Sequence, residues 1–152
     1  MFRGTHYLSN DVKGRFAVPM RYRDLLMKAS SGGLVITAHP AERCLLIYPT
    51  PQWDEIQLKI EKLSNLNTKL HDIQLMLMGM ATDVEMDGQG RVLIAPHLRD
   101  YAQIEKKGVL VGQGKKFEYW QEDKWNSKVQ NWTSNGLVSD EEMEAEVANL
   151  TL

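Results

Sequence analysis

Hydrophobic and polar positions follow the same order twice along the chain. In residues 5–52, and again in residues 81–124, short strand-like apolar runs surround one helix-like stretch. In the run Arg15–Val18 apolar and polar side chains alternate, which is typical of a strand buried on one face. Each copy alone is too small to bury a convincing core. The repeat therefore predicts two interleaved units, related by a pseudo-twofold axis and forming one barrel.

The elements predicted in the two copies correspond to each other. In the first copy we expect strands at 4–8, 15–18, 34–37 and 44–48, with a helix from Pro19 to Ala29. In the second we expect strands at 82–86, 92–95, 109–112 and 116–120, with a helix that Pro96 opens and Gly108 ends. Proline suits the first helical position because its missing N–H costs little there. The distance from arginine to proline is one residue longer in the second copy, which predicts a β-bulge in one strand.

A helical region, residues 53–80, connects the two copies. Its apolar residues recur three or four positions apart, which predicts an apolar helical stripe. These residues are Ile56, Ile60, Leu63, Leu66, Leu70, Ile73, Leu77 and Met80. Polar capping residues interrupt the stripe, so we expect helices at about 52–63 and 68–78, with Asn67 as N-cap and Gly79 as the end of the second. Residues 125–152 add a C-terminal helix and an acidic tail, and the predicted class is α+β.

The same five-residue turn occurs once in each copy. The first is Asp11-Val12-Lys13-Gly14-Arg15 and the second is Asp87-Gly88-Gln89-Gly90-Arg91. Aspartate and arginine at the two ends of such a turn can face each other, and a salt bridge that only pins the turn is one interpretation. A carboxylate that orients a guanidinium also prepares it for recognition, because less rotamer freedom is lost on binding.

Arginine can pair with the N7/O6 edge of guanine through two hydrogen bonds, which lysine cannot reproduce as a planar pair. The two turns differ at their third position. Lys13 suits a phosphate as a point charge, while Gln89 can pair with a base edge or with backbone. The first copy is therefore the more basic of the two.

Charge is distributed unevenly along the chain. The net charge of −2 argues against a nonspecific nucleic-acid binder. Residues 1–28, however, hold six basic and two acidic side chains, while residues 134–152 hold five acidic and no basic ones. This asymmetry is compatible with an anionic partner. A tail that only aids solubility is the alternative interpretation of the acidic segment.

Composition and motifs favour a binding protein over an enzyme. Apolar residues make up 43% and charged residues 25% of the chain, as in globular proteins. No nucleophile elbow, phosphate loop or metal-ligand spacing is present, and the histidines His6, His39, His71 and His97 are isolated in sequence. We therefore expect no catalytic site, no small-molecule substrate, no cofactor and no metal.

Other segments are predicted as structural. The glycine-rich segment 112–116 is predicted as a hairpin turn, and Cys44 as a core residue of a protein in a reducing cytoplasm. The sequence has no apolar run of membrane-spanning length and no signal-peptide apolar region.

With these motifs the chain resembles the MraZ family of bacterial transcriptional regulators, over about residues 1–130. The residues that carry the resemblance are Met1-Phe2-Arg3-Gly4, the segments Asp11–Pro19 and Asp87–Ile94, Leu110-Val111-Gly112-Gln113 and Phe117-Glu118-Tyr119-Trp120. The resemblance implies two AbrB-like swapped-hairpin units in one chain and assembly into a ring-like homo-oligomer. It also implies binding to short G-containing direct repeats in the promoter of the division and cell-wall gene cluster, as a repressor of its own operon.

Individual roles follow from the same resemblance. Arg15 becomes the DNA-contacting arginine and Arg91 its counterpart, with Lys13 and Arg3 as phosphate partners by position. Gln89 is a further candidate for DNA contact. The motif-orienting residues are Asp11, Gly14, Asp87 and Gly90.

Two hypotheses from different classes result. The first is a DNA-binding repressor, cytoplasmic and nucleoid-associated. The second is an oligomeric scaffold that does not bind DNA but binds an acidic protein partner through the Asp–Arg turns. Specific, salt-dependent binding to the chain's own upstream DNA separates the two.

Overall fold

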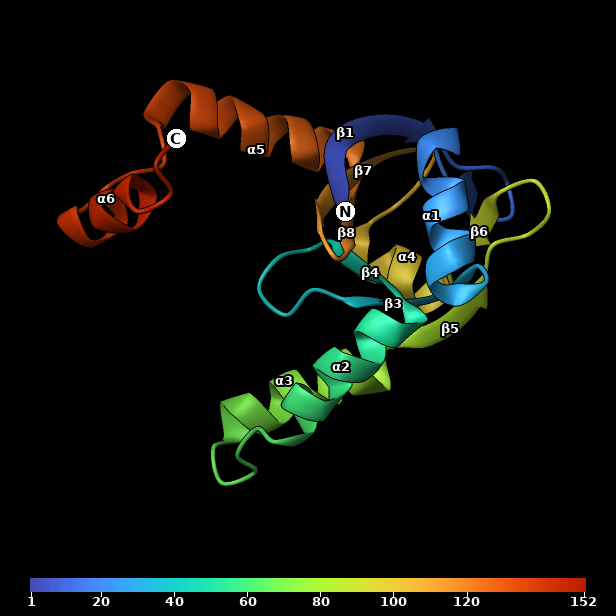
Figure 1. Ribbon diagram of the computed structural model, residues 1–152, viewed down its shortest axis with the longest axis horizontal. Coiled ribbons are helices and arrows are strands. Elements are labelled where there is room, and N and C mark those ends of the chain that lie inside the picture. The colour runs from blue at the N-terminus through green and yellow to red at the C-terminus, as the bar shows by residue number, and fades with distance from the viewer. The chain divides into compact units, whose positions relative to one another are not determined.

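The computed structural model describes residues 1–152, and the chain divides into two compact units, Met1–Glu122 and Asp123–Leu152. The first unit mixes short helices with antiparallel strands, which confirms the α+β class (Figure 1). Its elements are β1 (Phe2–Ser9), β2 (Arg15–Ala17), α1 (Met20–Ser30), β3 (Gly33–Ala38), β4 (Leu45–Pro49), α2 (Thr50–Glu61), α3 (Thr68–Gly79), β5 (Thr82–Glu85), β6 (Arg91–Leu93), α4 (Pro96–Ala102), β7 (Lys107–Gly114) and β8 (Phe117–Gln121).

The strands form one six-stranded sheet and one two-stranded ribbon. The sheet has the order β1-β7-β8-β4-β3-β5, and the ribbon pairs β2 with β6. All neighbours are antiparallel. Strands β1, β3 and β4 of the first copy correspond to β5, β7 and β8 of the second. Exchanging each strand for its counterpart gives the same strand order, read from the opposite end of the sheet. The first strand of each copy pairs with the hairpin of the other, β1 with β7 and β5 with β3, so the copies are interleaved as the repeat predicts.

The sheet does not close into the expected barrel. Its edge strands β1 and β5 do not pair with each other, and the ribbon forms a separate small sheet. The ribbon instead packs its inner face on the core, where Phe16 and Val92 are fully buried. The ribbon thus covers the core through side-chain packing and does not join the sheet by a continuous hydrogen-bond ladder.

Aromatic contacts join the two copies inside the main core. Phe2 stacks on Phe117 with ring centroids 4.2 Å apart, and Phe16 stacks on Tyr119 at 4.6 Å. Each pair joins a ring from β1 or β2 to a ring from β8. Aromatic pairs of this kind stabilise a core beyond the area they bury, by about 0.5–1.5 kcal/mol. Neither copy could complete this core alone.

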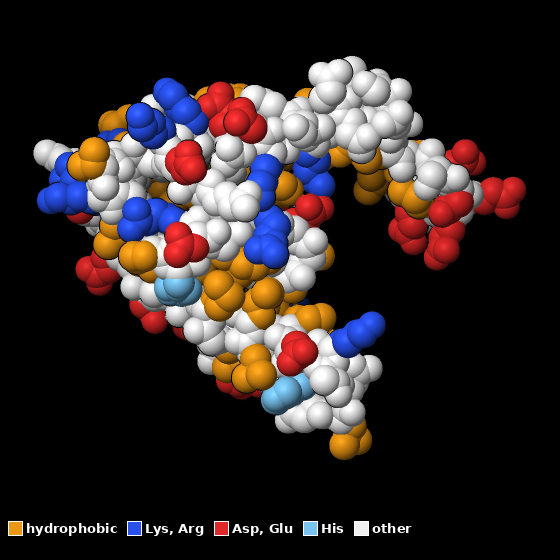
Figure 2. Space-filling model, turned by 180° about the vertical axis from the view of Figure 1, so that it is seen from behind, with side chains coloured by type: hydrophobic (Ala, Val, Ile, Leu, Met, Phe, Trp, Pro, Cys, Tyr) orange, Lys and Arg blue, Asp and Glu red, His pale blue; other side chains and the backbone are white.

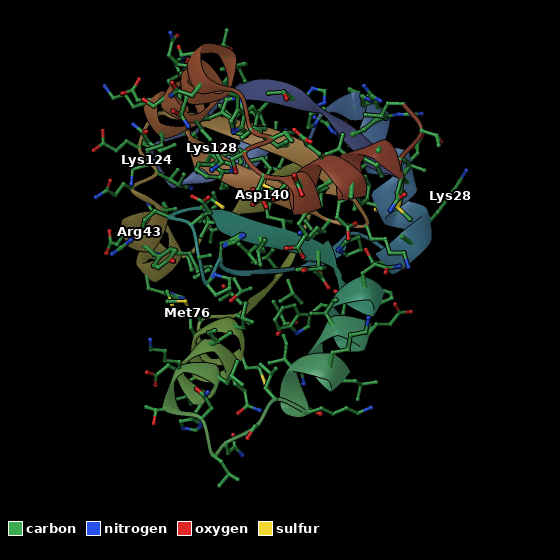
Figure 3. All side chains as sticks on the ribbon, turned by 90° about the vertical axis from the view of Figure 1, so that its left-hand side faces the viewer. Lys28, Arg43, Met76, Lys124, Lys128 and Asp140 are labelled. Atoms are coloured by element: carbon green, nitrogen blue, oxygen red, sulfur yellow. The ribbon has the colours of Figure 1, made fainter.

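The helices α2 and α3 lie side by side and extend away from the sheet (Figures 1 and 3). The expected N-cap is confirmed, because Asn67 Oδ1 accepts hydrogen bonds from the backbone N–H groups of Lys69 and Leu70 at 3.0 and 3.2 Å. Gly79 is the last helical residue rather than the residue beyond it. Met76, labelled in Figure 3, packs against the main core. None of the helices combines the length and apolar character that crossing a membrane would require.

Three local predictions are wrong, and each has a physical reason. Neither copy has the expected β-bulge, because β2 and β6 pair residue by residue. The helix N-caps, Pro19 and Ala95, both come four residues after the motif arginine. Pro19 is consequently the N-cap rather than the first helical residue. The helix α4 ends at Ala102, with Gln103 in the left-handed region at φ 56°. Gly108 lies inside β7, where the ring of Tyr119 occupies the space that a side chain would need.

The second unit consists of α5 (Glu122–Asn135), which begins at the boundary, and α6 (Glu141–Ala148). The acidic tail is thus partly helical, which the sequence did not predict. Asp140 caps α6 by accepting a hydrogen bond from the Met143 N–H at 2.8 Å. The glutamates of the first turn, among them Glu141 and Glu142, lie near the helix N-terminus, where negative charge is favourable.

Candidate functional site

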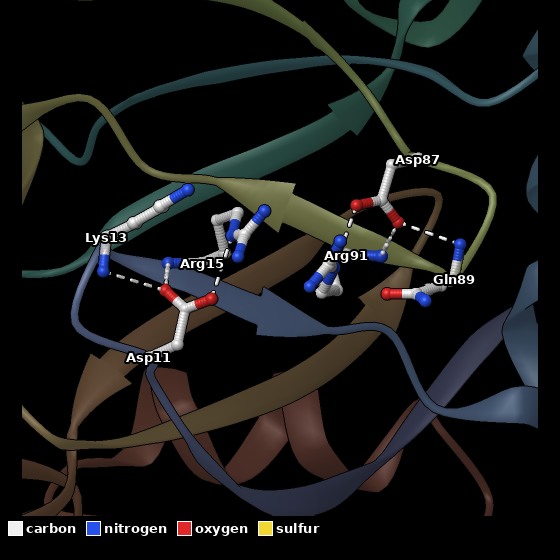
Figure 4. Close-up of polar contacts among 6 residues, drawn as sticks. All are labelled: Asp11, Lys13, Arg15, Asp87, Gln89 and Arg91. Carbon is white, nitrogen blue, oxygen red and sulfur yellow. Dashed lines mark hydrogen bonds and ion pairs between the residues drawn. The ribbon is translucent and has the colours of Figure 1, made fainter.

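The two arginines of the repeated motif lie on one face of the β2–β6 ribbon. The register pairs Arg15 with Leu93 and Ala17 with Arg91. Phe16 and Val92 point to the core, so the other four side chains share the outer face. Diagonal neighbours on such a pair of strands are about 7–8 Å apart. The fold therefore presents two guanidinium groups close together on a partly exposed surface (Figure 4).

The first turn is organised by the carboxylate of Asp11. Its Oδ1 accepts hydrogen bonds from the backbone N–H groups of Lys13 at 3.0 Å and Arg15 at 2.9 Å. Its Oδ2 accepts from Arg15 Nε at 2.8 Å, so the same residue closes the turn and holds the guanidinium. Gly14 adopts a φ of 85°, in the region that favours glycine.

The second turn reproduces this arrangement. Asp87 Oδ1 accepts from the backbone N–H groups of Gln89 at 2.9 Å and Arg91 at 2.8 Å, and Oδ2 accepts from Arg91 Nε at 2.8 Å. Gly90 has a φ of 75°. The expectation that aspartate and arginine face each other across each turn is confirmed in both copies.

The aspartate uses only one edge of each guanidinium. In both turns Nε is engaged, while the Nη groups of Arg15 and Arg91 have no acceptor in the structure. A guanidinium held in this way still offers planar N–H donors to a ligand with two acceptors. The arrangement can therefore recognise a base edge or a phosphate without first reorganising the side chain.

The surroundings of the two aspartates keep them ionised. Hydrogen bonds from the backbone N–H and the side chain of Arg15 lower the pKa of Asp11 below its usual range, and the Lys13 N–H contributes. Arg91 lowers the pKa of Asp87 in the same way, with help from the Gln89 N–H. Each turn therefore carries its full ion pair at neutral pH.

Each turn is supported by an arginine of the other copy. Arg99 of α4 packs against Gly14, and Arg23 of α1 packs against Gly90. Both are fixed by backbone carbonyls, since Arg99 Nε donates to the Ile94 oxygen at 3.0 Å and Arg23 Nε donates to the Val18 oxygen at 2.7 Å. These two arginines were not singled out from the sequence. The signal that could have found them is an Arg-Asp pair eight residues after each motif arginine.

Comparison with known proteins places the chain in a family. The family model "MraZ protein", whose description adds "antitoxin-like", matches residues 1–74 and 76–147. The chain belongs to the MraZ family. It is 50% identical over 129 residues to the transcriptional regulator MraZ of Saccharophagus degradans, covering 85% of this chain and 88% of that protein. It is 41% and 43% identical, over the full length of both chains, to the proteins of the same name from Halorhodospira halophila and Coxiella burnetii.

The remaining predicted site residues of this MraZ-family chain lie in different places. Lys13 and Gln89 are exposed at equivalent positions of the two turns, where each is held through its backbone N–H. Arg3 lies on β1 opposite Gln113 of β7, and its carbonyl accepts a hydrogen bond from the Tyr22 hydroxyl. The structure therefore brings Lys13 and Arg15 together in one turn, while Arg3 belongs to the sheet edge.

Positive charge gathers around the ribbon of this MraZ-family chain. In Figure 2, Lys and Arg side chains cluster toward the left-hand side, over the part of the first unit that holds α1 and the ribbon in Figure 1. Cys44 is fully buried, as expected for a core residue. No group of three or more His, Cys, Asp or Glu side chains converges in a way that could hold a metal ion.

Proposed function

We propose that this MraZ-family chain is a sequence-specific DNA-binding transcription regulator that represses its own division and cell-wall gene cluster. One observation carries the proposal: two arginines, each held by an aspartate through Nε, share the outer face of one ribbon with their Nη groups unengaged. The relatives named transcriptional regulator support the same class of function. The proposal contains no catalytic step and no cofactor.

The shape of the ribbon suits the major groove of DNA. A two-stranded β-ribbon fits that groove, and arginine there pairs with O6 and N7 of guanine. Two arginines about 7–8 Å apart span roughly two base-pair steps of 3.4 Å. A short box of neighbouring guanines is therefore the natural target of this face.

The residues of the two turns take different parts in this proposal. Arg15 reads guanine, Lys13 and Arg3 bind phosphates, and Arg91 and Gln89 contribute fewer contacts. The turns are shaped by the residues Asp11, Gly14, Asp87 and Gly90. The partly exposed guanidiniums and the exposed Lys13 are consistent with these parts.

Assembly completes the proposal. The interleaved strand pairing supports two AbrB-like swapped-hairpin units, residues 5–52 and 81–124, joined by the helical linker 53–80 and followed by residues 125–152. A ring-like homo-oligomer of such chains, in the cytoplasm and at the nucleoid, would place several ribbons on direct repeats in one promoter. Several weak contacts on one body gain affinity through effective concentration.

A gel-shift titration with the DNA upstream of the chain's own gene tests the proposal. Wild-type protein should shift this DNA, with affinity falling linearly on a log–log plot against salt. The control is the same DNA with its G-containing boxes scrambled, which should bind only nonspecifically. Equal binding of both DNAs, or no shift at all, would contradict the proposal and favour the scaffold hypothesis.

A further inference from the structure

A cavity of about 290 Å³ lies in the first unit between α2 and the β7–β8 turn. It is distinct from the two Asp–Arg turns, and nothing in the proposed function uses it. Its walls come from both copies of the repeat, because Tyr48 and Gln52 belong to the first copy while the β7–β8 turn belongs to the second. Its volume lies just below the range of about 300–1,000 Å³ that is typical of small-molecule sites.

The cavity has an apolar wall, beside which the polar side chains of Gln52 and Gln113 also line it. Ile56 and the ring of Tyr48 form this wall, and Tyr48, only 7% exposed, packs on Trp53 with ring centroids 5.6 Å apart. The Tyr48 hydroxyl has no hydrogen-bond partner in the structure. Every fully buried side-chain polar atom does have one, so this hydroxyl keeps some exposed surface, and Tyr48 is among the residues that line the cavity. Burial, with a contribution from Glu118, raises the pKa of Tyr48, so the hydroxyl stays protonated at neutral pH and can donate a hydrogen bond.

The rim of the cavity is positively charged. Lys59, Lys115 and Lys116 line it against a single acidic residue, Glu55. Lys116 Nζ donates to Gln113 Oε1 at 2.7 Å, while Lys59 and Lys115 have no hydrogen-bond or ion-pair partner. Lysine binds phosphate as a point charge. Two unpaired ammonium groups above an apolar wall therefore suit a ligand that has a dianionic end and an apolar body.

We propose that this cavity is a binding site for a small phosphate monoester with an apolar body. A phosphate monoester carries a charge of about −1.5 to −2 at neutral pH, which matches the excess positive charge of the rim. The apolar body lies against Tyr48 and Ile56, and the Tyr48 hydroxyl donates a hydrogen bond to the ligand. Because the walls come from both copies, the bound ligand stabilises the contact between α2 and the β7–β8 turn.

Calorimetric titration of the full-length protein with phenyl phosphate tests this inference. Phenyl phosphate should bind saturably, with one molecule per chain, and should raise the melting temperature. Inorganic phosphate and phenol, which each lack one half of the ligand, should bind at least about tenfold more weakly. Phosphate binding as tight as that of phenyl phosphate would mean that exposed lysines merely attract anions. That result, or the absence of saturable binding, overturns the proposal.

Three variants locate the site. Tyr48→Phe removes only the hydroxyl and should weaken phenyl phosphate binding about tenfold, as expected for a hydrogen bond to a charged group. The double variant Lys59→Gln/Lys115→Gln should weaken it further, while Lys62→Gln, an exposed lysine outside the cavity, serves as the matched control. Unchanged binding in both cavity variants, or equal loss in the control, overturns the assignment. All three should still shift the upstream DNA, which keeps this test independent of the proposed function.

Discussion

The two Asp–Arg turns have the same geometry but different chemistry. Their corresponding hydrogen bonds agree within 0.1 Å, and both glycines adopt a positive φ. The side chains at the second and third positions differ, since the first turn presents Val12, fully exposed, and Lys13 where the second presents Gly88 and Gln89. The hydrogen-bond frame is thus shared by both copies, while only the first turn adds a second positive charge beside the motif arginine.

The packing behind the two turns also differs, and it is tighter behind the second turn. A Cβ at Gly90 would lie 2.2 Å from Arg23 Nε, whereas a Cβ at Gly14 would lie 2.7 Å from the Arg99 guanidinium. The second turn is therefore the more tightly packed, and the motif arginine is more exposed there, at 37% against 25%. The comparison therefore predicts that Gly90 tolerates an added side chain less well than Gly14.

The largest expected effect is on DNA affinity. Arg15→Ala should lower operator affinity by about 1–3 kcal/mol per engaged subunit, because one bidentate guanine contact is lost. Arg91→Ala should cost clearly less if the second turn contributes fewer base contacts. Gel shifts of both folded variants measure the difference, and a larger loss for Arg91→Ala would reverse the assigned roles.

The next effect concerns stability. Gly90→Ala should destabilise the fold by about 1–2 kcal/mol from its left-handed backbone alone, with additional cost from displacing Arg23. Gly14→Ala should be milder because its contact with Arg99 is longer. Chemical denaturation of both variants measures the order. Gly88→Ala is the control, because nothing lies within 4 Å of its added Cβ. Equal destabilisation by Gly88→Ala would remove the steric explanation.

The features that the sequence predicts depend on residues that are close together in the chain. The repeat, the Asp–Arg pairing, the Asn67 cap and most strands follow from spacing and turn chemistry, which depend on near neighbours. Interleaving of the copies also follows, since neither copy can bury a core alone.

What the sequence does not predict depends on contacts between the copies. Arg23 and Arg99 support the turns only because each contacts the turn of the other copy. The open sheet and the position of Gly108 within β7 likewise depend on strand neighbours that are distant in sequence. The cavity at Tyr48 brings α2 to the β7–β8 turn, more than fifty residues away, and no motif marks it.

Asp11 should matter more for stability than Arg15. The carboxylate accepts two backbone hydrogen bonds in addition to the arginine, so Asp11→Ala leaves the turn without its organising acceptor. Arg15→Ala removes only the side-chain pair. Thermal melts should therefore show a lower Tm for Asp11→Ala than for Arg15→Ala, and equal values would exclude the structural role.

The same ion pairs predict acid sensitivity of the turns. Folding lowers the pKa of Asp11 and Asp87, so their stabilising contribution is complete above the usual aspartate pKa of about 4. It is lost as the pH falls from there through the lowered folded values. The double variant Asp11→Ala/Asp87→Ala should thus lose less stability than wild type below pH of about 4 in acid titrations. Parallel curves would show that neither pair contributes.

The smallest expected effect is on salt dependence. Lys13→Gln makes the first turn resemble the second and should reduce the salt slope of DNA binding by about 1, the amount for one lost phosphate contact. Gln89→Lys should move the slope the other way if the second turn reaches phosphate. Binding titrations at several salt concentrations measure both slopes, and an unchanged slope for Lys13→Gln would place this lysine away from the DNA backbone.

The central claim is that the guanidinium forks read guanine. The most direct measurement compares wild-type binding to operator DNA with binding to the same DNA containing 7-deazaguanine in each box, which removes the N7 acceptor. Wild-type protein should bind the substituted DNA at least about tenfold more weakly, whereas Arg15→Ala should bind both DNAs nearly equally. Equal wild-type affinity for both DNAs would contradict guanine recognition by these arginines.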